Sequence, residues 1–452
     1  MRTPTHRPRI GDPMDRRQFV AGSAGMIGAA AVGCTTSRAG EYGSPSAGAV
    51  ATGGRTTDAD RPVAESIRAL RPMTAGIVPI SDDERRARME KARRLMIENN
   101  IDAVFIEPGT SMSYFTGVRW GTSERMFALV LPARGEPAFI CPAFEEARAR
   151  EVVRFSNDIR LWQEDENPGA LVVQVLRDRG LATRRIGIEE RARFFLMDSI
   201  RRAAPAAEYV LADPVTAGCR MFKSPAELAL MQRANDITHA AFKAAFATMT
   251  EGMTQNDLRN QIAAAYNALG ISASATPQFG KYTAYPHGSS TPQRLREGDV
   301  VLVDGGCTIE GYQSDITRTT VFGKPTQRQR DVWDLEKRAQ AAALAACRVG
   351  VPCEAVDAAA RKVITDAGFG PDYRVPGLPH RTGHGIGMDG HEWTNLVRGN
   401  RTPLAPGMCF SDEPMIAIYG EFGIRLEDCF YMTEAGPRLF TPVSPSIEQP
   451  CA

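Results

Sequence analysis

The chain has 452 residues, which is enough for two or three domains. Apolar residues make up 43% of it and charged residues 24%, as is ordinary for a soluble globular protein. The net charge is only +1 and no basic tract with interleaved aromatic residues occurs, so nucleic acid is not an expected partner.

Residues 1–34 are typical of a targeting segment. Arg16 and Arg17 precede a Gly/Ala-rich stretch that is too short to span a membrane, and this pattern resembles a twin-arginine export signal. The stretch ends in a sequence that resembles a lipobox, with Cys34 as the residue that would carry lipid. We therefore expect export by the twin-arginine route. The protein would be lipid-anchored at the envelope through Cys34 or, with plain cleavage nearby, periplasmic.

Residues 35–76 are rich in Ser, Thr, Gly, Ala and Pro, which predicts a flexible linker. Residues 77–215 alternate between helical and strand patterns, beginning with a capping box at Ser81 and Glu84. The predicted helices are 81–99, 143–154, 168–180 and 193–203, and the predicted strands are 103–106, 127–131, 138–140 and 186–188. This alternation indicates an α/β domain.

A second domain is predicted over residues 216–445. Ser224, Pro225 and Glu227 form a strong helix start, with a serine cap and proline at the first helical position. Further helices are predicted after Thr254, from 326 to 349 and over 354–367, and strands over 300–303, 408–418 and 423–432. This domain is expected to be α+β.

Three of the six histidines fall within residues 380–391, interleaved with glycines. Glycine disfavours helices, so His380 and His384 are not expected to share a helical face. Extended backbone would instead bring imidazoles to one crowded point, as a metal or acid–base site needs. Chance clustering is the alternative.

Two pairs of carboxylates have hairpin spacing. If Glu310 and Gly311 form a two-residue turn, Asp304 pairs with Thr317, and Asp315 then lies on the same face as Asp304. Glu413 and Glu427 lie seven residues either side of Gly420, so a hairpin centred there sets them opposite each other. Like charges in these positions are destabilising without a cation between them. Each carboxylate alone could face solvent.

Four carboxylates and one imidazole form an oxygen-rich site that suits Mn²⁺ or Co²⁺, with Zn²⁺ as an alternative. So many carboxylates are more than one dication needs. Two metal ions about 3.5–4 Å apart, bridged by a water that attacks as hydroxide, fit better.

Asp304, Asp315, His384, Glu413 and Glu427, in this order and spacing, resemble the ligands of the dinuclear metallopeptidases of the pita-bread fold. That group includes methionine aminopeptidase, aminopeptidase P, prolidase and creatinase. The resemblance covers about residues 77–440 and implies an α+β pita-bread catalytic domain preceded by an α/β creatinase/prolidase-like N-terminal domain. It also implies a homodimeric exopeptidase that cuts X–Pro bonds in proline-containing peptides, as an Xaa-Pro dipeptidase or aminopeptidase.

By this resemblance, Asp304 would chelate one metal and His384 would bind the other, while Asp315 and Glu427 would bridge them. Glu413 would be a ligand that also shuttles the proton of the attacking water.

The resemblance also implies roles for residues around the metals. His287 would steady the reacting amide, His391 would bind the scissile carbonyl region, and His380 would line the proline-side pocket. Arg425 would order the Glu427 carboxylate. Trp120 would be a lid residue reaching the partner subunit's cleft, or simply a half-buried surface aromatic.

Two positions depart from the family pattern. Ala417 stands where prolidases and aminopeptidases P commonly have tyrosine, and Tyr419 lies two residues further on. No arginine closely follows His391, so Arg398 is the first candidate for a substrate-carboxylate clamp, with Arg401 after it. The alternatives are a same-scaffold enzyme acting on a small non-peptide substrate, such as a lyase or organophosphate hydrolase, and a catalytically inactive binding module.

Overall fold

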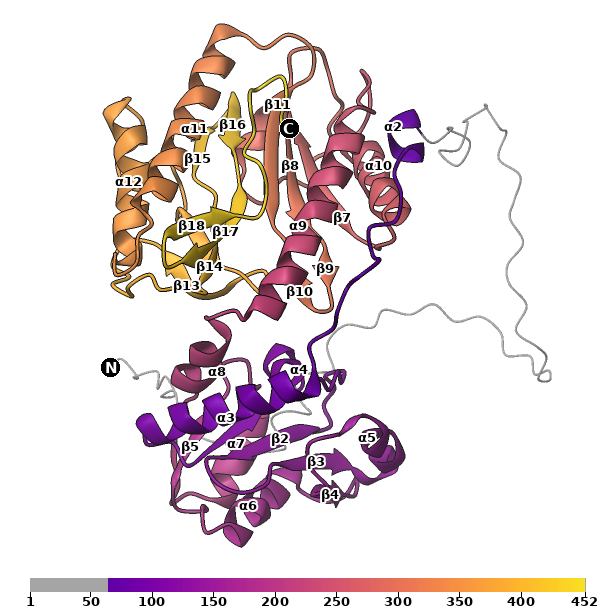
Figure 1. The fold of residues 1–452 in the computed structure, drawn as a ribbon, viewed down its shortest axis with the longest axis vertical. Coiled ribbons are helices and arrows are strands. Elements are labelled where there is room, and N and C mark those ends of the chain that lie inside the picture. The colour runs from indigo at the N-terminus through magenta and orange to yellow at the C-terminus, as the bar shows by residue number, and fades with distance from the viewer. Residues whose placement is uncertain (1–63, 452) are drawn as a thin grey trace, which may run out of the picture. The chain divides into compact units, whose positions relative to one another are not determined.

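The computed structural model describes residues 64–451 (Figure 1). The twin-arginine segment, Cys34 and the first part of the expected linker lie outside the described residues. Among the helices of 64–451, none combines the length and the apolarity that crossing a bilayer requires.

Residues 64–76 correct the predicted linker. Helix α2 (Glu65–Arg68) packs with Ile67 only 2% exposed, and the Ser66 hydroxyl donates to the carbonyl of Ala244 at 2.9 Å. Leu70 and Met73 continue the same apolar contact. The composition of this stretch suggested a linker, but Ile67, Leu70 and Met73 recur at three-residue intervals and pack against the catalytic domain.

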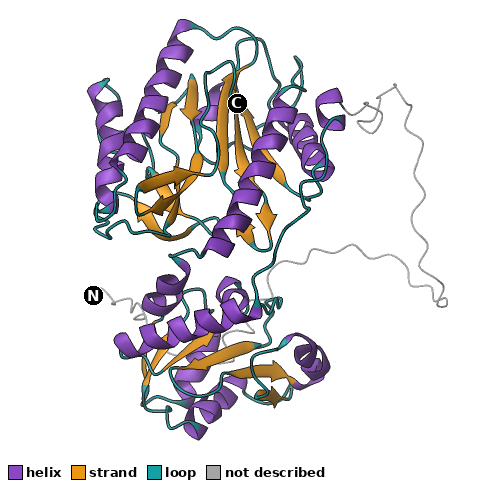
Figure 2. Ribbon diagram, in the orientation of Figure 1, coloured by secondary structure: helices purple, strands orange, loops and turns teal. Residues whose placement is uncertain are grey.

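The first domain is a six-stranded sheet in the order β4-β3-β2-β1-β5-β6, covered by helices on both faces (Figure 2). Its elements are α3 (Asp82–Glu98), β1 (Ala103–Ile106), α4 (Thr110–Thr116), β2 (Ala128–Pro132), β3 (Ala138–Pro142), α5 (Glu146–Val152), β4 (Ile159–Trp162), α6 (Pro168–Asp178), β5 (Arg185–Ile188), α7 (Phe194–Ala203), β6 (Glu208–Leu211) and α8 (Asp213–Arg220). Strand β1 shows why both faces are buried: Ala103 and Phe105 face the cluster with α6 and α7, whereas Val104 and Ile106 face that with α3 and α8. The α/β prediction is confirmed.

Helix α8 was not predicted, and the expected domain boundary at 215/216 falls inside it. Its residues Val215 and Cys219 pack in one core with Met89 and Met96 of α3. Because this apolar face belongs to the first core, the second domain begins after α8. Helix α4 and strands β4 and β6 were also missed.

The second domain contains α9 (Pro225–Phe246), α10 (Gln255–Ala268), α11 (Gln327–Ala346) and α12 (Cys353–Asp366) around curved antiparallel sheets (Figure 1). The capping boxes at Ser224, Thr254 and Thr326 are all formed. The strands are β7 (Ser274–Phe279), β8 (Val300–Gly306), β9 (Thr308–Ile309), β10 (Tyr312–Gln313), β11 (Ile316–Val321), β12 (Gly383–Gly385), β13 (Glu392–Leu396), β14 (Cys409–Asp412), β15 (Met415–Ile418), β16 (Phe422–Arg425), β17 (Asp428–Thr433) and β18 (Gly436–Leu439).

Both predicted hairpin registers are confirmed. Asp304 pairs with Thr317 across β8 and β11, and Glu310 and Gly311 form the turn with positive φ angles of 49° and 95°. The predicted strands 408–418 and 423–432 are each interrupted at a glutamate, but one register runs through both interruptions: Asp412 faces Asp428, and Met415 faces Arg425. Glu413 therefore lies opposite Glu427.

Candidate metal centre

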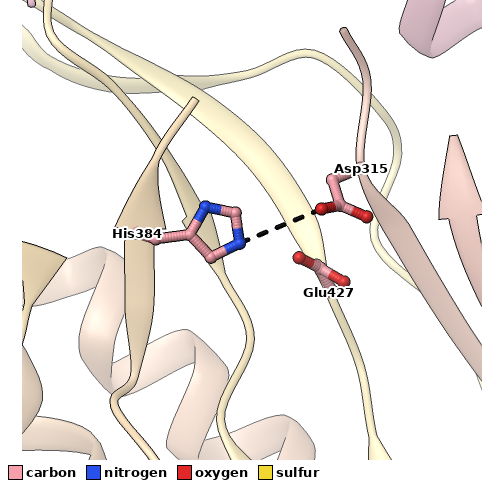
Figure 3. A group of neighbouring side chains, drawn as sticks. All are labelled: Asp315, His384 and Glu427. Atoms are coloured by element: carbon pink, nitrogen blue, oxygen red, sulfur yellow. Dashed lines mark ion pairs between the residues drawn. The ribbon is translucent and has the colours of Figure 1, made fainter. Parts of the chain in front are cut away.

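The five predicted ligands converge from five places in the second domain. Ligand atoms of Asp315, His384 and Glu427 all lie within 4.8 Å of one another (Figure 3). His384 Nε2 is 3.2 Å from Glu413 Oε1 and 3.9 Å from Asp315 Oδ2. Asp304 joins the group from β8. Burial raises the pKa of Asp315, and repulsion from Asp304 raises it further.

His384 lies on the three-residue strand β12, which is clamped between β13 and β14. A Cβ at Gly383 would lie 2.1 Å from the carbonyl oxygen of Ser411, so the close packing requires glycine there. The His384 Nδ1–H donates to its neighbour's carbonyl, Gly385 O, at 3.1 Å. Burial, together with the nearby His391, lowers the pKa of His384 to about 3. The imidazole is therefore neutral, with the Nε2 lone pair directed at the carboxylates.

The carboxylates repel one another strongly. Burial raises the pKa of Glu427 well above its usual range, and Asp315 and Glu413 raise it further. Burial also raises the pKa of Glu413 to about 7 against the opposing charge of Arg425. Within residues 64–451, Glu427 Oε1 is buried without a hydrogen-bond partner. A cluster of buried anions with a free oxygen and a free imidazole lone pair is chemically suited to divalent cations.

Thr317 and Arg425 form hydrogen bonds and an ion pair with the carboxylates of this cluster. The Thr317 hydroxyl lies 2.9 Å from Asp304 Oδ1 and 2.7 Å from Glu427 Oε2, and its one proton can serve either acceptor. Arg425 Nε donates to that hydroxyl at 3.0 Å, and its Nη2 pairs with Asp304 Oδ2 at 2.7 Å. Thr317 forms a β-bridge with Glu427, and its hydroxyl lies between Arg425 and the Glu427 carboxylate. The predicted ordering of Glu427 by Arg425 would therefore act through Thr317.

Replacing Thr317 with valine is expected to weaken Mn²⁺ binding and catalysis by roughly 10–100-fold, because two ligand carboxylates lose their common donor. Calorimetric titration of Mn²⁺ into chelator-treated protein measures the affinity. Thr320→Val is the matched control, since that buried hydroxyl on the same strand donates to Ile447 O, away from the carboxylates. Equal losses in both variants would contradict a specific role for Thr317.

His391 lies against the ligand histidine, with the ring centroids of His384 and His391 4.0 Å apart. Arg381 Nη2 donates to His391 Nδ1 at 3.2 Å, which leaves Nε2–H as the donor of the neutral ring. Partial burial lowers the pKa of His391, and Arg381 and His287 lower it further, which favours the neutral ring. His287 is therefore near this group, and Arg425 holds the preceding residue through Pro286 O at 3.1 Å.

His380 is also neutral. Its Nδ1–H donates to Arg381 O at 2.7 Å, and its Nε2 is buried with no partner in the described part of the chain. Burial, aided by the charge of Arg425, lowers the pKa of His380 to about 3. Its free lone pair can accept a hydrogen bond from a bound molecule.

Two predicted substrate-binding residues are engaged elsewhere. Arg398 is half exposed and pairs with Asp372 at 2.6 Å, its guanidinium near the ring of Tyr373. A substrate carboxylate would have to displace Asp372 from this exposed pair, so the clamp role of Arg398 stays a prediction. Trp120 stacks on Phe127 within its own domain, with the ring centroids 4.1 Å apart. This agrees with the alternative interpretation of Trp120 as a half-buried surface aromatic. Its role as a lid across a dimer stays a prediction.

Arg381 is the arginine that the structure brings to the centre. Simple strand alternation would place its side chain on the face opposite His380 and His384, so sequence reasoning did not predict it. Its position within the histidine run was the available signal.

Position 417 is also informative. Ala417 is fully buried and pairs with Gly377, so no phenol occupies this place. The nearby Tyr419 is 52% exposed and stacks on Tyr285 with ring centroids 5.5 Å apart. These two rings lie in the segments that carry Glu413 and His287.

Comparisons with known proteins agree with this geometry. Residues 229–434 match metallopeptidase family M24, and residues 88–222 match the creatinase/prolidase N-terminal domain. The chain is 31% identical over 369 residues to an Xaa-Pro dipeptidase of Lactobacillus delbrueckii subsp. lactis, covering 80% of this chain and 98% of that protein.

Solved structures give the same result. The crystal structure of dipeptidase PepE from Mycobacterium ulcerans is similar with a TM-score of 0.75 and 33% identity, covering 81% of this chain and 97% of that one. A recombinant prolidase from Thermococcus sibiricus is similar with a TM-score of 0.73 and 29% identity, covering 80% and 98%.

Proposed function

Since the chain belongs to metallopeptidase family M24, with a creatinase/prolidase N-terminal domain and the pita-bread fold expected for it, we propose that it is an exopeptidase that hydrolyses X–Pro bonds with two divalent metal ions. The observation that carries this proposal is the meeting of four carboxylates with the buried, neutral His384, whose Nε2 is directed at them. The names of the relatives support the proline preference.

Membership of the family implies how the ligands would be divided between the two ions. Asp304 and Asp315 would hold one ion, and His384 with Glu413 the other, with Asp315 and Glu427 shared between them. Carboxylate-rich ligation favours Mn²⁺ or Co²⁺ over Zn²⁺. When bound, the ions would polarise the scissile carbonyl and activate a water for attack.

The chain's own groups supply the remaining steps. Glu413 would accept a proton at a carboxylate oxygen and return it to the leaving proline nitrogen. His391 presents Nε2–H as a donor to the scissile carbonyl oxygen, in the tautomer that Arg381 maintains. His380 forms a neutral wall, and Arg381 is, beside Arg398, a candidate to bind a substrate carboxylate.

The test is an assay of purified, Mn²⁺-loaded protein on Ala-Pro, Gly-Pro and an X-Pro tripeptide, with Ala-Ala and Pro-Ala as matched controls. Release of proline, or of Pro-containing dipeptide, from the X–Pro substrates alone is expected. No cleavage of any X–Pro substrate by protein with bound metal would overturn the proposal. The buried Ala417 supports a second candidate, a same-scaffold enzyme for a small non-peptide substrate, and turnover of an organophosphate ester with no peptide cleavage would favour it.

The twin-arginine pattern before Cys34 supports a further proposal, export by that route to the periplasm or to a lipid anchor at the envelope. Fractionation of cells that express the full chain or a Cys34→Ala variant tests it. A soluble periplasmic Cys34→Ala protein and a membrane-bound parent would support the anchor. Homodimerisation is likewise proposed, and light scattering of the purified protein tests it.

A further inference from the structure

The turn between β12 and β13, residues 386–391, carries His391 and is folded around one carboxylate. Glu392 Oε1 accepts from the backbone N–H of Met388 at 2.9 Å and of Asp389 at 3.0 Å. The other side of the turn is fastened by Gln313, whose backbone N–H donates to Gly387 O at 2.8 Å. We call residues 386–391 the His391 loop.

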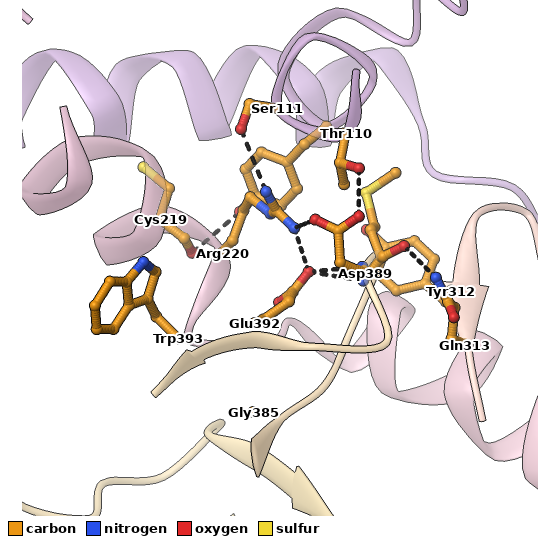
Figure 4. Close-up of polar contacts among 12 residues, drawn as sticks. Thr110, Ser111, Cys219, Arg220, Tyr312, Gln313, Gly385, Asp389, Glu392 and Trp393 are labelled. Atoms are coloured by element: carbon orange, nitrogen blue, oxygen red, sulfur yellow. Dashed lines mark hydrogen bonds and ion pairs between the residues drawn. The ribbon is translucent and has the colours of Figure 1, made fainter. Parts of the chain in front are cut away.

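An arginine from the other domain reaches into this loop (Figure 4). Arg220, at the end of α8, places Nη2 2.5 Å from Asp389 Oδ2 and 2.5 Å from Glu392 Oε1. Arg220 is 7% exposed, and the Glu392 side chain is 4% exposed. Lys223 Nζ completes the cluster at 3.1 Å from Glu392 Oε2.

Other parts of the N-terminal domain hold the same loop and its flank. The Thr110 hydroxyl donates to Asp389 Oδ1 at 2.7 Å, and Arg191 Nη1 lies 3.1 Å from that oxygen. Trp393 Nε1 donates to Glu190 Oε2 at 2.7 Å. Three separate segments of the first domain thus contact the loop that carries a residue of the metal centre.

The ion pair between Arg220 and Glu392 stays charged over the physiological range. Burial alone would raise the pKa of Glu392, but Lys223 and Arg220 lower it to about 2. The Glu392 carboxylate and the Arg220 guanidinium therefore remain ionised. Both contacts come from the single nitrogen Nη2, while Nη1 donates to the Ser111 hydroxyl of α4 at 3.3 Å. The planar guanidinium therefore joins the loop to the N-terminal domain through two different nitrogens.

His391 depends on its backbone for its position, because its own side chain is exposed rather than wedged in a core. Its ring contacts are with His384 and Arg381. We propose that Arg220 is a positioning residue: through Asp389 and Glu392 it fixes the His391 loop, so that the N-terminal domain sets where His391 stands beside the metal centre. This inference rests on the role of His391 in the proposed function.

The test is a double-mutant cycle of Arg220→Lys and His391→Ala in the full chain loaded with Mn²⁺. Arg220→Lys keeps the charge but is shorter and lacks the second nitrogen that donates to Ser111. A loop displaced by about 1 Å as a result is expected to lower kcat by up to roughly 100-fold. KM and bound Mn²⁺ should stay within about 2-fold, and in the His391→Ala background Arg220→Lys should cause no further loss. Arg193→Lys is the matched control, since Arg193 pairs with the buried Glu107 within the N-terminal domain.

Hydrogen–deuterium exchange provides a readout that does not depend on turnover. The amides of Met388 and Asp389, which donate to Glu392, should exchange at least about 10-fold faster in Arg220→Lys and remain unchanged in Arg193→Lys. Unchanged exchange would overturn the inference even if no X–Pro substrate is cleaved by the parent protein. The inference would also be overturned if Arg220→Lys lowered activity equally in the wild-type and His391→Ala backgrounds. An inactive parent with faster loop exchange in Arg220→Lys would instead count against the proposed function alone.

Discussion

Replacing Asp315 with asparagine is expected to lower X–Pro hydrolysis by more than about 100-fold, beyond the range of residues that only support metal ligands. The substitution removes a carboxylate proposed to be shared by both ions. In the metal-free protein the same substitution should raise the melting temperature, because burial and repulsion from Asp304 and Glu413 disfavour the charged form of Asp315. Activity and metal-free stability should thus change in opposite directions.

The pH dependence checks the cause. The pKa of Glu413 is raised to about 7 from the usual 4.5, so its contribution to stability is fully present below pH 4.5 and lost as pH rises through 7. Metal-free wild-type protein should therefore lose stability between these values, and the advantage of Asp315→Asn should grow from pH 5 to pH 8. Excess Mn²⁺ should stabilise the wild type and leave Asp315→Asn nearly unchanged.

Scanning calorimetry of chelator-treated and Mn²⁺-loaded samples measures these differences. Asp158→Asn is the control, because Asp158 pairs with Arg179 at 2.8 Å in the N-terminal domain and its loss should lower stability with or without metal. If the metal-free Asp315→Asn protein were less stable than the wild type at pH 8, repulsion of Asp315 by Asp304 and Glu413 would not be the cause.

The second large effect is expected at Arg318, which is completely buried. Its Nη2 pairs with the buried Asp428 at 2.6 Å, and its Nη1 donates to Glu427 O at 2.8 Å. Arg318→Met should destabilise the catalytic domain by about 3–5 kcal/mol, because Asp428 is left charged in the core. Urea unfolding measures the change.

Arg328→Met is the matched control for Arg318→Met. Arg328 makes a two-pronged contact with Glu421, at 2.7 and 3.0 Å, but both side chains are about half exposed. Solvent screens such a pair, so the expected loss is below about 1 kcal/mol. Similar losses at the two positions would show that burial does not decide the strength of these ion pairs.

Turn residues made the ligand geometry predictable from sequence. Glu310-Gly311 and Gly420 each define a hairpin, and a hairpin determines which residues face each other many positions away. The carboxylate pairs followed from that without knowledge of the fold. Glycines around His384 likewise excluded a helix and indicated close backbone packing.

What the sequence could not predict depends on contacts between distant segments. Arg220 and Asp389 are 169 positions apart, and no periodicity relates them. Arg398 was chosen by its distance along the chain from His391, which takes no account of Asp372 as its partner. Helix α4 has only seven residues, too few for a 3.6-residue pattern to be recognised.

The contacts of Thr110, Arg191 and Arg220 with the His391 loop bear on how this enzyme could be recombined with its relatives. A chimera joined in the connection after α8 would keep every proposed metal ligand in a single parental segment. It would nevertheless separate Asp389 and Glu392 from the partners that hold them. For such an exchange to succeed, the incoming N-terminal domain would have to carry the same side chains at the positions of Thr110, Arg191 and Arg220. The sequences of the two domains therefore depend on each other, although each domain has its own core.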